Sequence, residues 1–420
     1  MKSAFNYRFL LPVLFFILPF YSNALGVLTH EAIIDAAWDK SILPLLKYRY
    51  PAATEEEQKI AHAYAYGGAV APDMGYYPLG SKLFTNLVHY VRSGDMVNAL
   101  LRNAENINQY AFALGFLSHY NADNYGHPLG TNRSVTLVYP KLRRKYGNEV
   151  TYAQNKISHM RMEFGFDVLE VAKGNYASQA YRNFIGFKVD TAVLAKAFME
   201  TYGLDINAVH KNHFSRSVET FRWIVANIFP VITKQAWAAK KKAILEKDST
   251  ATASRFNYKM RNKNYDKEFG TGYRRPGFFP TLLSFFIRVL PKVGPLRPLK
   301  FKAPTIEAEK YFTQGFDTVM YHYTTNIKKL NRQNIQLEDL DFDTGKPTAL
   351  CEYSLADYTY RDLLLNLKAD KFKNITPSLQ QNILSFYTQV NASQGNRNAS
   401  KKCRGFFNAL HDLKTISVNK

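Results

Sequence analysis

Apolar residues recur every three or four positions along most of this chain, which is the spacing of an amphipathic helix. No stretch shows the alternation of apolar and polar residues that is typical of a half-buried strand, and no internal repeat is evident. The pattern predicts helices over residues 30–40, 54–68, 83–91, 106–127, 154–172, 191–202, 207–245, 305–330, 355–368 and 377–390. Gly67 and Gly68 are expected to end the second helix, and a loop is expected at 71–75. The sequence therefore predicts an all-α fold.

The helix at 106–127 is apolar until its last turns, where the sequence SHYNADNYGHP occupies residues 118–128. His119, Asp123 and His127 are spaced four residues apart, so they would lie on one face of a helix. Two imidazoles and a carboxylate are a ligand set for zinc or a similar divalent metal. Taken alone, the stretch also fits buried histidines with a capping aspartate.

The first residues have the pattern of a secretory signal. Lys2 and Arg8 precede an apolar run at residues 10–20 that is short for a membrane span, and Ser22-Asn23-Ala24 is a small-residue cleavage site. The sequence predicts a signal peptide at 1–24, a mature N-terminus at Leu25, and export to the periplasm, the cell surface or the medium. A retained signal anchor is the alternative.

The chain is strongly basic, with a net charge of +21 that two residues of the signal would reduce to +19. Such a surface favours anionic partners, either phospholipid headgroups or nucleic acid. The two cysteines, Cys351 and Cys403, lie far along the chain from the histidine-rich part, and a disulfide between them is compatible with export but not required.

Composition divides the chain after the signal into three parts. Residues 25–245 are expected to form a helical catalytic domain, residues 246–305 a basic connecting segment rich in proline and glycine, and residues 306–420 a C-terminal helical extension without a chemical motif. Within the connecting segment, the apolar stretch 278–290 is expected either to pack on the domain or to touch a membrane surface. His322 and His411, in the extension, are expected to be ordinary surface or packing residues.

Further metal-ligand residue types gather in the first part of the chain. His30, Asp73 and His89 precede the central series, and His159 and Glu163 follow it as an i, i+4 pair. Singly, Asp73 fits a turn residue and the His159–Glu163 pair fits an exposed helical hydrogen bond; His62 fits a structural role. Together, imidazoles and carboxylates without cysteines indicate a catalytic rather than a structural metal cluster.

These motifs, Leu25-Gly26-x3-His30, Ala71-Pro72-Asp73, His89, His119-x3-Asp123-x3-His127 and His159-x3-Glu163, resemble those of the zinc-dependent phospholipase C family. That family shares a helical fold and a three-zinc site with the single-strand-specific, 3'-nucleotidase-type nucleases. The resemblance covers residues 25 to about 165 in motifs and implies the fold to about residue 245.

The resemblance implies a ligand set for up to three Zn²⁺ ions. One zinc would be held by the amino group and carbonyl of Leu25 together with His30, and Asp123 would bridge it to a second zinc. The second zinc would also take Asp73, His89 and His119, and the third would take His127, His159 and Glu163. Asp73 would also orient or deprotonate the attacking water.

The chain departs from the family pattern in three places. Leu25 stands where the family usually has tryptophan, the interval from His119 to His127 is two residues shorter, and Met74 replaces the tyrosine of a choline pocket. The implied function is phospholipase C-type hydrolysis of a phospholipid. A zinc-dependent single-strand nuclease or 3'-nucleotidase, for which nucleic acid would be the partner, and a zinc-stabilised non-catalytic binding protein remain alternatives. The headgroup and the oligomeric state are left open.

Overall fold

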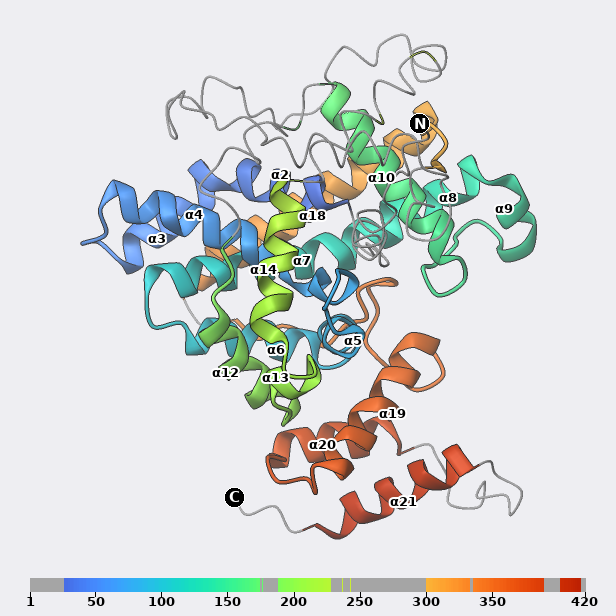
Figure 1. Cartoon of the computed structure of the whole chain (residues 1–420). Helices are drawn as coiled ribbons and strands as arrows, with labels where there is room; N and C mark the ends of the chain where they lie inside the picture. The colour runs from blue at the N-terminus through green and yellow to red at the C-terminus, as the bar shows by residue number, and fades with distance from the viewer. Residues whose placement is uncertain are drawn as a thin grey trace, which may run out of the picture.

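The chain folds as helices packed on one another, seen here in a computed structural model that describes residues 26–173, 176, 188–227, 236, 242, 300–332, 335–388 and 401–416 (Figure 1). Within those ranges there is no strand, and a single isolated bridge joins Leu340 to Pro347. The all-α prediction is therefore confirmed. The predicted signal peptide, Leu25 and the segment 278–290 lie outside the described residues, and the domain boundaries stay a prediction.

The first part of the chain contains most of the described helices. In order they are α2 (Val27–Ala37), the π turn η2 (Trp38–Ile42), α3 (Leu43–Arg49), α4 (Glu55–Val70), the 3-10 helix η3 (Ala71–Tyr76), α5 (Lys82–Tyr90), α6 (Ser93–Asn103), α7 (Ile107–Gly126), the π turn η4 (His127–Thr131), α8 (Asn132–Val138), α9 (Pro140–Tyr146), α10 (Lys156–Ala172), α12 (Thr191–Tyr202), α13 (Ile206–Val209) and α14 (Phe214–Asn227). The second part contains α18 (Ile306–Leu330), α19 (Ser354–Ala369), α20 (Pro377–Phe386) and α21 (Lys401–Thr415).

Helices α4 and α7 form the most closely packed pair in the described core. A Cβ atom on Gly68 would lie 2.0 Å from the carbonyl oxygen of Phe112, and one on Gly115 would lie 2.0 Å from the carbonyl oxygen of Ala65. Only glycine allows the two backbones to approach so closely. The expected helix end at Gly67 and Gly68 is therefore wrong: α4 continues to Val70, since packing outweighs the weak helix propensity of glycine.

Side-chain caps fix where these two helices begin. The Thr54 hydroxyl accepts from the Glu57 backbone N–H while the Glu57 carboxylate accepts from Thr54, which is a complete capping box. The Asn106 side chain accepts from the backbone N–H groups of Asn108 and Gln109 at the start of α7. Both starts agree with the sequence pattern, because caps are local in sequence.

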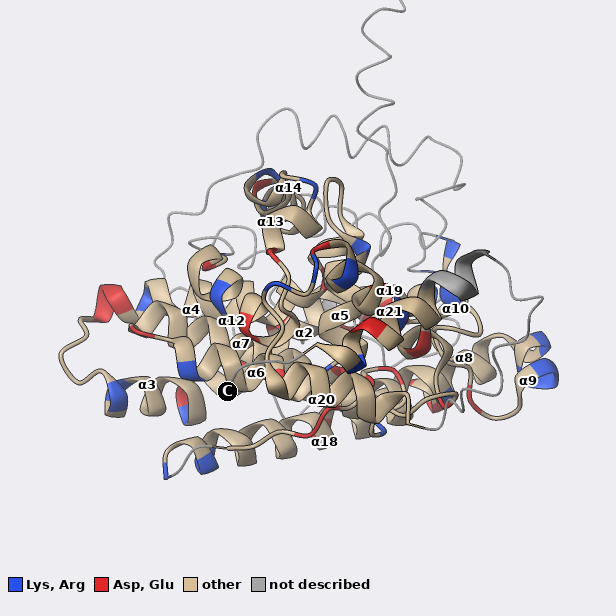
Figure 2. Cartoon of the chain, turned by 90° about the horizontal axis from the view of Figure 1, so that it is seen from below, with Lys and Arg blue, Asp and Glu red and all other residues tan. Residues whose placement is uncertain are grey.

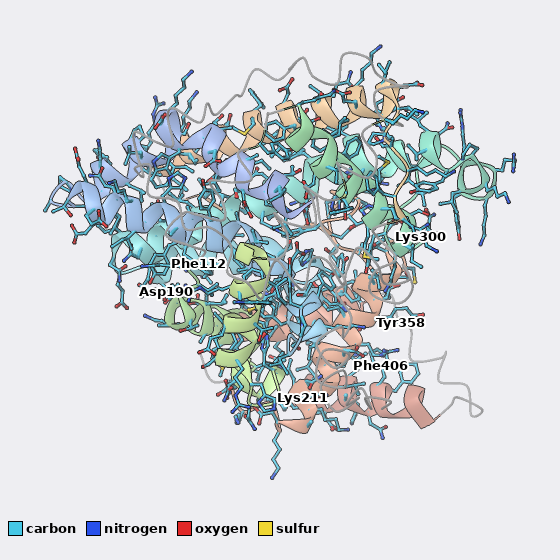
Figure 3. All side chains as sticks on the ribbon, turned by 45° about the horizontal axis from the view of Figure 1, so that its top comes forward. Phe112, Asp190, Lys211, Lys300, Tyr358 and Phe406 are labelled. Atoms are coloured by element: carbon cyan, nitrogen blue, oxygen red, sulfur yellow. The ribbon has the colours of Figure 1, made fainter. Side chains whose placement is uncertain are left out.

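The long helix expected over 207–245 is divided. Helix α13 ends at Val209 and α14 starts at Phe214, because Lys211 and Asn212 between them adopt positive φ angles of 54° and 62°. Figure 3 shows the Lys211 side chain extending away from the protein at this corner.

The C-terminal helices pack on the same core as the first part. The Tyr323 hydroxyl on α18 donates to the carbonyl oxygen of Leu114 on α7, at 3.0 Å. Helix α19 packs against α5 and against α21, and α19–α21 lie together at one end of the molecule in Figure 1. Cys351, just before α19, is an exposed free thiol; the side chain of Cys403 lies outside the described residues.

The surface has one conspicuously basic edge. Helix α9 carries Lys141, Arg143, Arg144 and Lys145 with no buried residue, and Figure 2 shows it as a blue projection at the rim. Among the described helices, none combines the length and the apolar character that crossing a bilayer requires.

Candidate metal centre

The α7 helix and the turn after it supply three of the predicted ligands. His119 and Asp123 lie one turn apart on α7, as the spacing predicts, but the α-helix ends at Gly126 and His127 starts the π turn η4. The three residues therefore do not form a single α-helical series. A π turn shifts side-chain direction relative to the regular helix, and such turns are common at functional sites. His127 nevertheless faces the same cluster.

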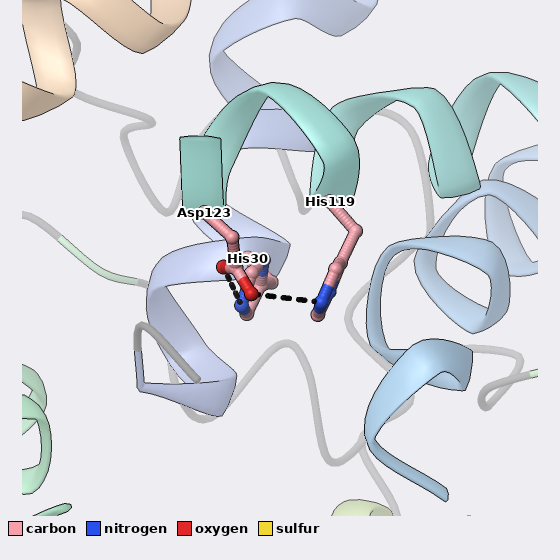
Figure 4. Close-up of side chains that lie close together, drawn as sticks. All are labelled: His30, His119 and Asp123. Carbon is pink, nitrogen blue, oxygen red and sulfur yellow. Dashed lines mark ion pairs between the residues drawn. The ribbon is translucent and has the colours of Figure 1, made fainter. Parts of the chain in front are cut away.

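Asp123 lies at the centre of the cluster and is fully buried. Its Oδ2 atom lies 3.2 Å from His119 Nε2 and 3.6 Å from His89 Nε2, while its Oδ1 atom lies 3.6 Å from His30 Nε2 and 3.8 Å from His127 Nε2. Figure 4 shows the Asp123 carboxylate between His30 and His119. Neither oxygen accepts a hydrogen bond, so each is left facing imidazole nitrogens from separate elements, as in a carboxylate that bridges two metal ions.

The Asp123 carboxylate is held in its charged form. Burial alone would raise its pKa, but His119 and His127 outweigh burial and lower the pKa of Asp123 below its usual range. A permanently ionised carboxylate is the form that binds a divalent cation.

The first group of ligands comprises Asp73 on η3, His89 on α5 and His119 on α7. His89 Nε2 lies 3.4 Å from Asp73 Oδ1 and 3.3 Å from His119 Nε2. Ligand atoms about 2.0 Å from a tetrahedral zinc lie about 3.3 Å from one another, so these separations fit zinc. Both Asp73 oxygens are buried without a hydrogen-bond partner, which a metal ion would supply.

Backbone carbonyls select the ring nitrogens that face this site. His89 Nδ1 lies 2.8 Å from the carbonyl oxygen of Thr85, and His119 Nδ1 lies 2.8 Å from that of Ala69. A carbonyl only accepts, so each Nδ1 carries a proton, and Nε2 is the nitrogen of each ring that is available to a metal ion.

The second group comprises His30, His119 and Asp123. His30 is buried, its two ring nitrogens have no hydrogen-bond partner, and its ring stacks on His119 with centroids 4.2 Å apart. Burial, followed by the neighbouring His119, lowers the pKa of His30 well below its ordinary value and so keeps the ring neutral, which is the metal-binding form. The predicted amino-terminal ligand, Leu25, precedes the described residues.

A distant carboxylate holds the helix that carries His30. Asp167 on α10 accepts from the backbone N–H groups of Leu28 and Thr29, at 3.2 and 3.1 Å, and from the Thr29 hydroxyl at 2.9 Å. Both N–H groups lie in the first turn of α2, whose own N-cap residue, Gly26, has no side chain that could accept from them. Asp167 therefore fixes the position of His30, and sequence analysis did not identify it.

The third group joins His127 to the pair on α10. Glu163 Oε1 lies 2.9 Å from His159 Nδ1 and 3.4 Å from His127 Nε2. Glu163 Oε1 and His159 Nδ1 are both buried without a hydrogen-bond partner. The structure thus brings together the three residues that the resemblance assigns to one zinc, and their spacing fits the ion.

Sequence analysis missed Asp343, which lies between α18 and α19 in the part predicted to lack a chemical motif. Its Oδ1 atom lies 3.5 Å from His127 Nδ1 and 3.4 Å from His159 Nε2, so it forms a close group with these two histidines. A weak signal was present: three aspartates alternate with apolar residues in Asp339-Leu-Asp-Phe-Asp343. No spacing motif connects that stretch to histidines almost two hundred residues earlier.

Three of the five other histidines were expected to have no metal role. His62 on α4 stacks on Trp38 with centroids 3.6 Å apart, and His322 on α18 stacks on Tyr125 at 3.8 Å. His411 lies on the exposed side of α21. None of the three is in the metal-ligand groups found among the described residues.

Comparison with known proteins agrees with the geometry. Residues 29–212 match a family model described as zinc dependent phospholipase C, which confirms the resemblance for that part of the chain. The match runs from within α2 to just past α13, so it covers every described residue of the predicted ligand set, while Asp343 lies outside it. No curated protein and no solved structure matches the chain.

Proposed function

We propose that this chain, with its zinc-dependent phospholipase C match, is an exported phosphodiesterase that hydrolyses phospholipids to a diacylglycerol and a phosphorylated headgroup. The observation that carries the proposal is the Asp123 carboxylate, whose two oxygens face imidazoles from α2, α5, α7 and η4 without a hydrogen bond of their own. The unpartnered, buried ligand atoms around it favour more than one Zn²⁺ ion, and we propose three.

Zinc ions in such a cluster lower the pKa of a bound water to near neutrality and neutralise the oxygens of a phosphodiester. The chain's own residues hold and orient the reactants. Asp73 is proposed to orient or deprotonate the attacking water, since both its oxygens are buried in the site and accept no hydrogen bond.

Export and cleavage before Leu25 are part of the proposal. Residues 26–30 are buried, and a Cβ atom on Gly26 would collide with the Asp167 carboxylate at 2.1 Å, so the start of the described chain is fixed deep in the protein. A new amino group one residue earlier would be close to His30. An α-amine ligates a metal only after losing its proton, so removal of the signal would also complete the site.

The proposed substrate side of the surface is basic. Helix α9 presents four cationic side chains at the rim, and each basic residue near an anionic bilayer contributes about 1 kcal/mol of attraction. The segment 278–290 is proposed as a peripheral membrane contact. The same positive charge would also attract a nucleic acid, so the substrate panel includes single-stranded DNA.

The test combines metal analysis with a substrate panel. Elemental analysis of the purified full chain should find close to three zinc ions, and vesicles of phosphatidylcholine or phosphatidylethanolamine should release phosphocholine or phosphoethanolamine. The Asp73→Asn variant loses both a charged ligand and the proposed base, so it should bind zinc more weakly and, with zinc in excess, turn over about 10²–10⁴ times more slowly. His411→Ala should match the wild type. Hydrolysis of single-stranded DNA in place of lipid would identify a nuclease, and a zinc-loaded protein inactive on both would be a binding protein.

A further inference from the structure

The C-terminal part of the chain reaches the metal centre through Asp343, a residue outside the segment that matches the family. We propose that Asp343 is a positioning residue that sets the orientation and the protonated nitrogen of His127 and His159, so that the third metal site is complete only with the C-terminal part in place. The inference rests on the zinc centre of the proposed function but concerns a residue that the family match does not include.

Hydrogen bonds to one of its two carboxylate oxygens hold the Asp343 side chain in place. Its Oδ2 atom accepts from the Tyr152 backbone N–H at 2.8 Å and from the Tyr353 hydroxyl at 2.6 Å. Its backbone N–H donates to Asp341 Oδ1 at 3.1 Å. Asp343 is 1% exposed, and its Oδ1 atom accepts no hydrogen bond. These contacts fix the carboxylate so that Oδ1 faces the rings of His127 and His159. A buried carboxylate oxygen is expected to have a polar partner, and the two rings are the groups that face it.

Two carboxylates contact the paired rings from opposite edges. Glu163 Oε1 faces His127 Nε2 and His159 Nδ1, at 3.4 and 2.9 Å. Asp343 Oδ1 faces the other nitrogen of each ring, His127 Nδ1 at 3.5 Å and His159 Nε2 at 3.4 Å. Asp123 Oδ1 lies 3.8 Å from His127 Nε2, on the Glu163 side. The metal cluster therefore lies on the Glu163 side, and Asp343 lies behind the rings.

Asn132 shows which nitrogen of His159 carries the proton. The Asn132 Nδ2 group donates to the Asp343 carbonyl oxygen at 2.8 Å, so its Oδ1 atom must be the one that faces His159 Nε2, also at 2.8 Å. An amide oxygen only accepts, so Nε2 is protonated and Nδ1 presents the lone pair. His159 thus cannot offer Nε2 to a metal shared with Asp343, which argues against Asp343 as a direct ligand.

For His127, the Asp343 carboxylate itself faces Nδ1. A proton on Nδ1 directed at the Asp343 carboxylate leaves the lone pair on Nε2, facing Glu163 and Asp123. A carboxylate behind a metal-binding imidazole fixes its tautomer and makes it a stronger ligand, and loss of such a group typically weakens metal binding by about 10- to 100-fold. Here the Asp343 carboxylate faces both imidazoles. The Asp343 backbone carbonyl oxygen separately holds the Asn132 amide, which fixes the protonated nitrogen of His159.

The experiment uses the full chain with Asp343→Ala, Asp343→Asn and, as a matched control on α19, the half-exposed Asp362→Asn. Zinc is removed stepwise with a graded series of chelator concentrations and counted by elemental analysis. Both Asp343 variants should lose one zinc at about 10- to 100-fold lower chelator concentration than wild type, with the other two retained. The control should follow the wild type.

Nitrogen NMR of the histidine rings provides a readout that a purely structural role would not change. In zinc-loaded protein with ¹⁵N-labelled histidine, Asp343→Ala should alter the Nδ1 and Nε2 shifts of His127 while those of His119, which donates to a backbone carbonyl, stay in place. Unchanged zinc release in folded variants would overturn the inference, as would a zinc-loaded crystal structure with an Asp343 oxygen bonded to metal. A wild-type chain that binds no zinc would instead overturn the proposed function.

Discussion

His89 Nε2 and His119 Nε2 face one another at 3.3 Å, although each ring already donates its Nδ1 proton to a backbone carbonyl. Two lone pairs directed at each other in a buried site repel unless a positive charge lies between them. The neighbouring carboxylates of Asp73 and Asp123 add negative charge to the same space. A Zn²⁺ ion would supply two positive charges there, whereas in the metal-free protein only protons on the rings can supply any.

Removal of zinc should therefore destabilise the fold as well as abolish turnover. A ligand present at about 100 times its dissociation constant stabilises the folded state by about 2.7 kcal/mol, and three sites compound the effect. Thermal unfolding followed by circular dichroism, with and without chelator, should show a lower midpoint for the metal-free chain, reversed by added zinc. His411→Ala should show the same shift; an unchanged midpoint in wild type would contradict a zinc centre in the core.

Replacing Asp123 should affect more of the centre than replacing any other ligand. Its two oxygens face different histidines, so Asp123→Asn removes a charge from both adjoining groups. We expect at least two zinc ions to be lost by elemental analysis, and turnover to fall at least about 10³-fold, since an electrostatic contact of this type is commonly worth 10² to 10³ on its own. Glu163→Gln, which touches the third group alone, is the comparison and should cost a single zinc ion.

Zinc binding should weaken as the pH falls. Burial opposes protonation of His119, His127 and His159, but nearby carboxylates outweigh it and raise the pKa of each ring above 6.5, that of His127 most clearly. In metal-free protein these rings therefore hold protons at pH values where an ordinary histidine is neutral, and zinc must displace them. Competition titrations at pH 8, 7 and 6 should show the apparent affinity falling by more than tenfold per unit once several rings are protonated.

The release of protons on zinc binding provides a direct control for these titrations. Zinc binding at pH 7 should release protons into an unbuffered solution, and the amount should decrease toward higher pH as the rings become neutral in the metal-free form. Affinity independent of pH across this range would mean that the carboxylates do not hold the rings protonated.

Asp167→Ala should loosen the start of α2. The substitution removes the acceptor of the Leu28 N–H and one of the two partners of the Thr29 N–H and hydroxyl, which keep Gly26 and Tyr176. We expect this to cost about 1–3 kcal/mol of unfolding free energy and to weaken the zinc at His30. Asp190→Ala is the matched control, because Asp190 caps α12 by accepting from Val193. It should cost about 1 kcal/mol and leave zinc content unchanged in the same elemental assay.

Glycine substitutions should separate close packing from helix propensity. A Cβ atom on Gly115 would lie 2.0 Å from the Ala65 carbonyl oxygen, whereas one on Gly315, within α18, would meet its nearest atom at 3.4 Å. Gly115→Ala should lower the unfolding free energy by at least about 1–3 kcal/mol, since two backbones must move apart. Gly315→Ala should be neutral or stabilising by up to about 1 kcal/mol. Urea denaturation of both variants would settle the comparison, and equal effects would contradict it.

The helices could be predicted because their signals are local. Apolar spacing is read within a few residues, and the structure begins α4 and α7 where this spacing places them. The prediction at Gly67 and Gly68 was wrong because these glycines allow a partner helix to approach, which no local pattern records. The π turn at His127 likewise packs against another element, α18.

The candidate site could be predicted only as far as its residues follow known spacing. His30, Asp73, His89, His119, Asp123, His127, His159 and Glu163 converge as the resemblance implies. Asp343 lies far along the chain from every ligand motif, and Asp167, although four residues after Glu163, accepts hydrogen bonds from α2. Contacts of that kind are set by tertiary structure alone.

The position of Asp343 also has a consequence for the order of assembly. Its partner His159 is synthesised long before it, and contacts between residues so distant in the chain close late in folding. If the chain is exported as proposed, the earlier helices would bring most of the ligands together before the last metal site is complete. Full activity of the proposed hydrolase would then follow only once the part of the chain that carries Asp343 had docked.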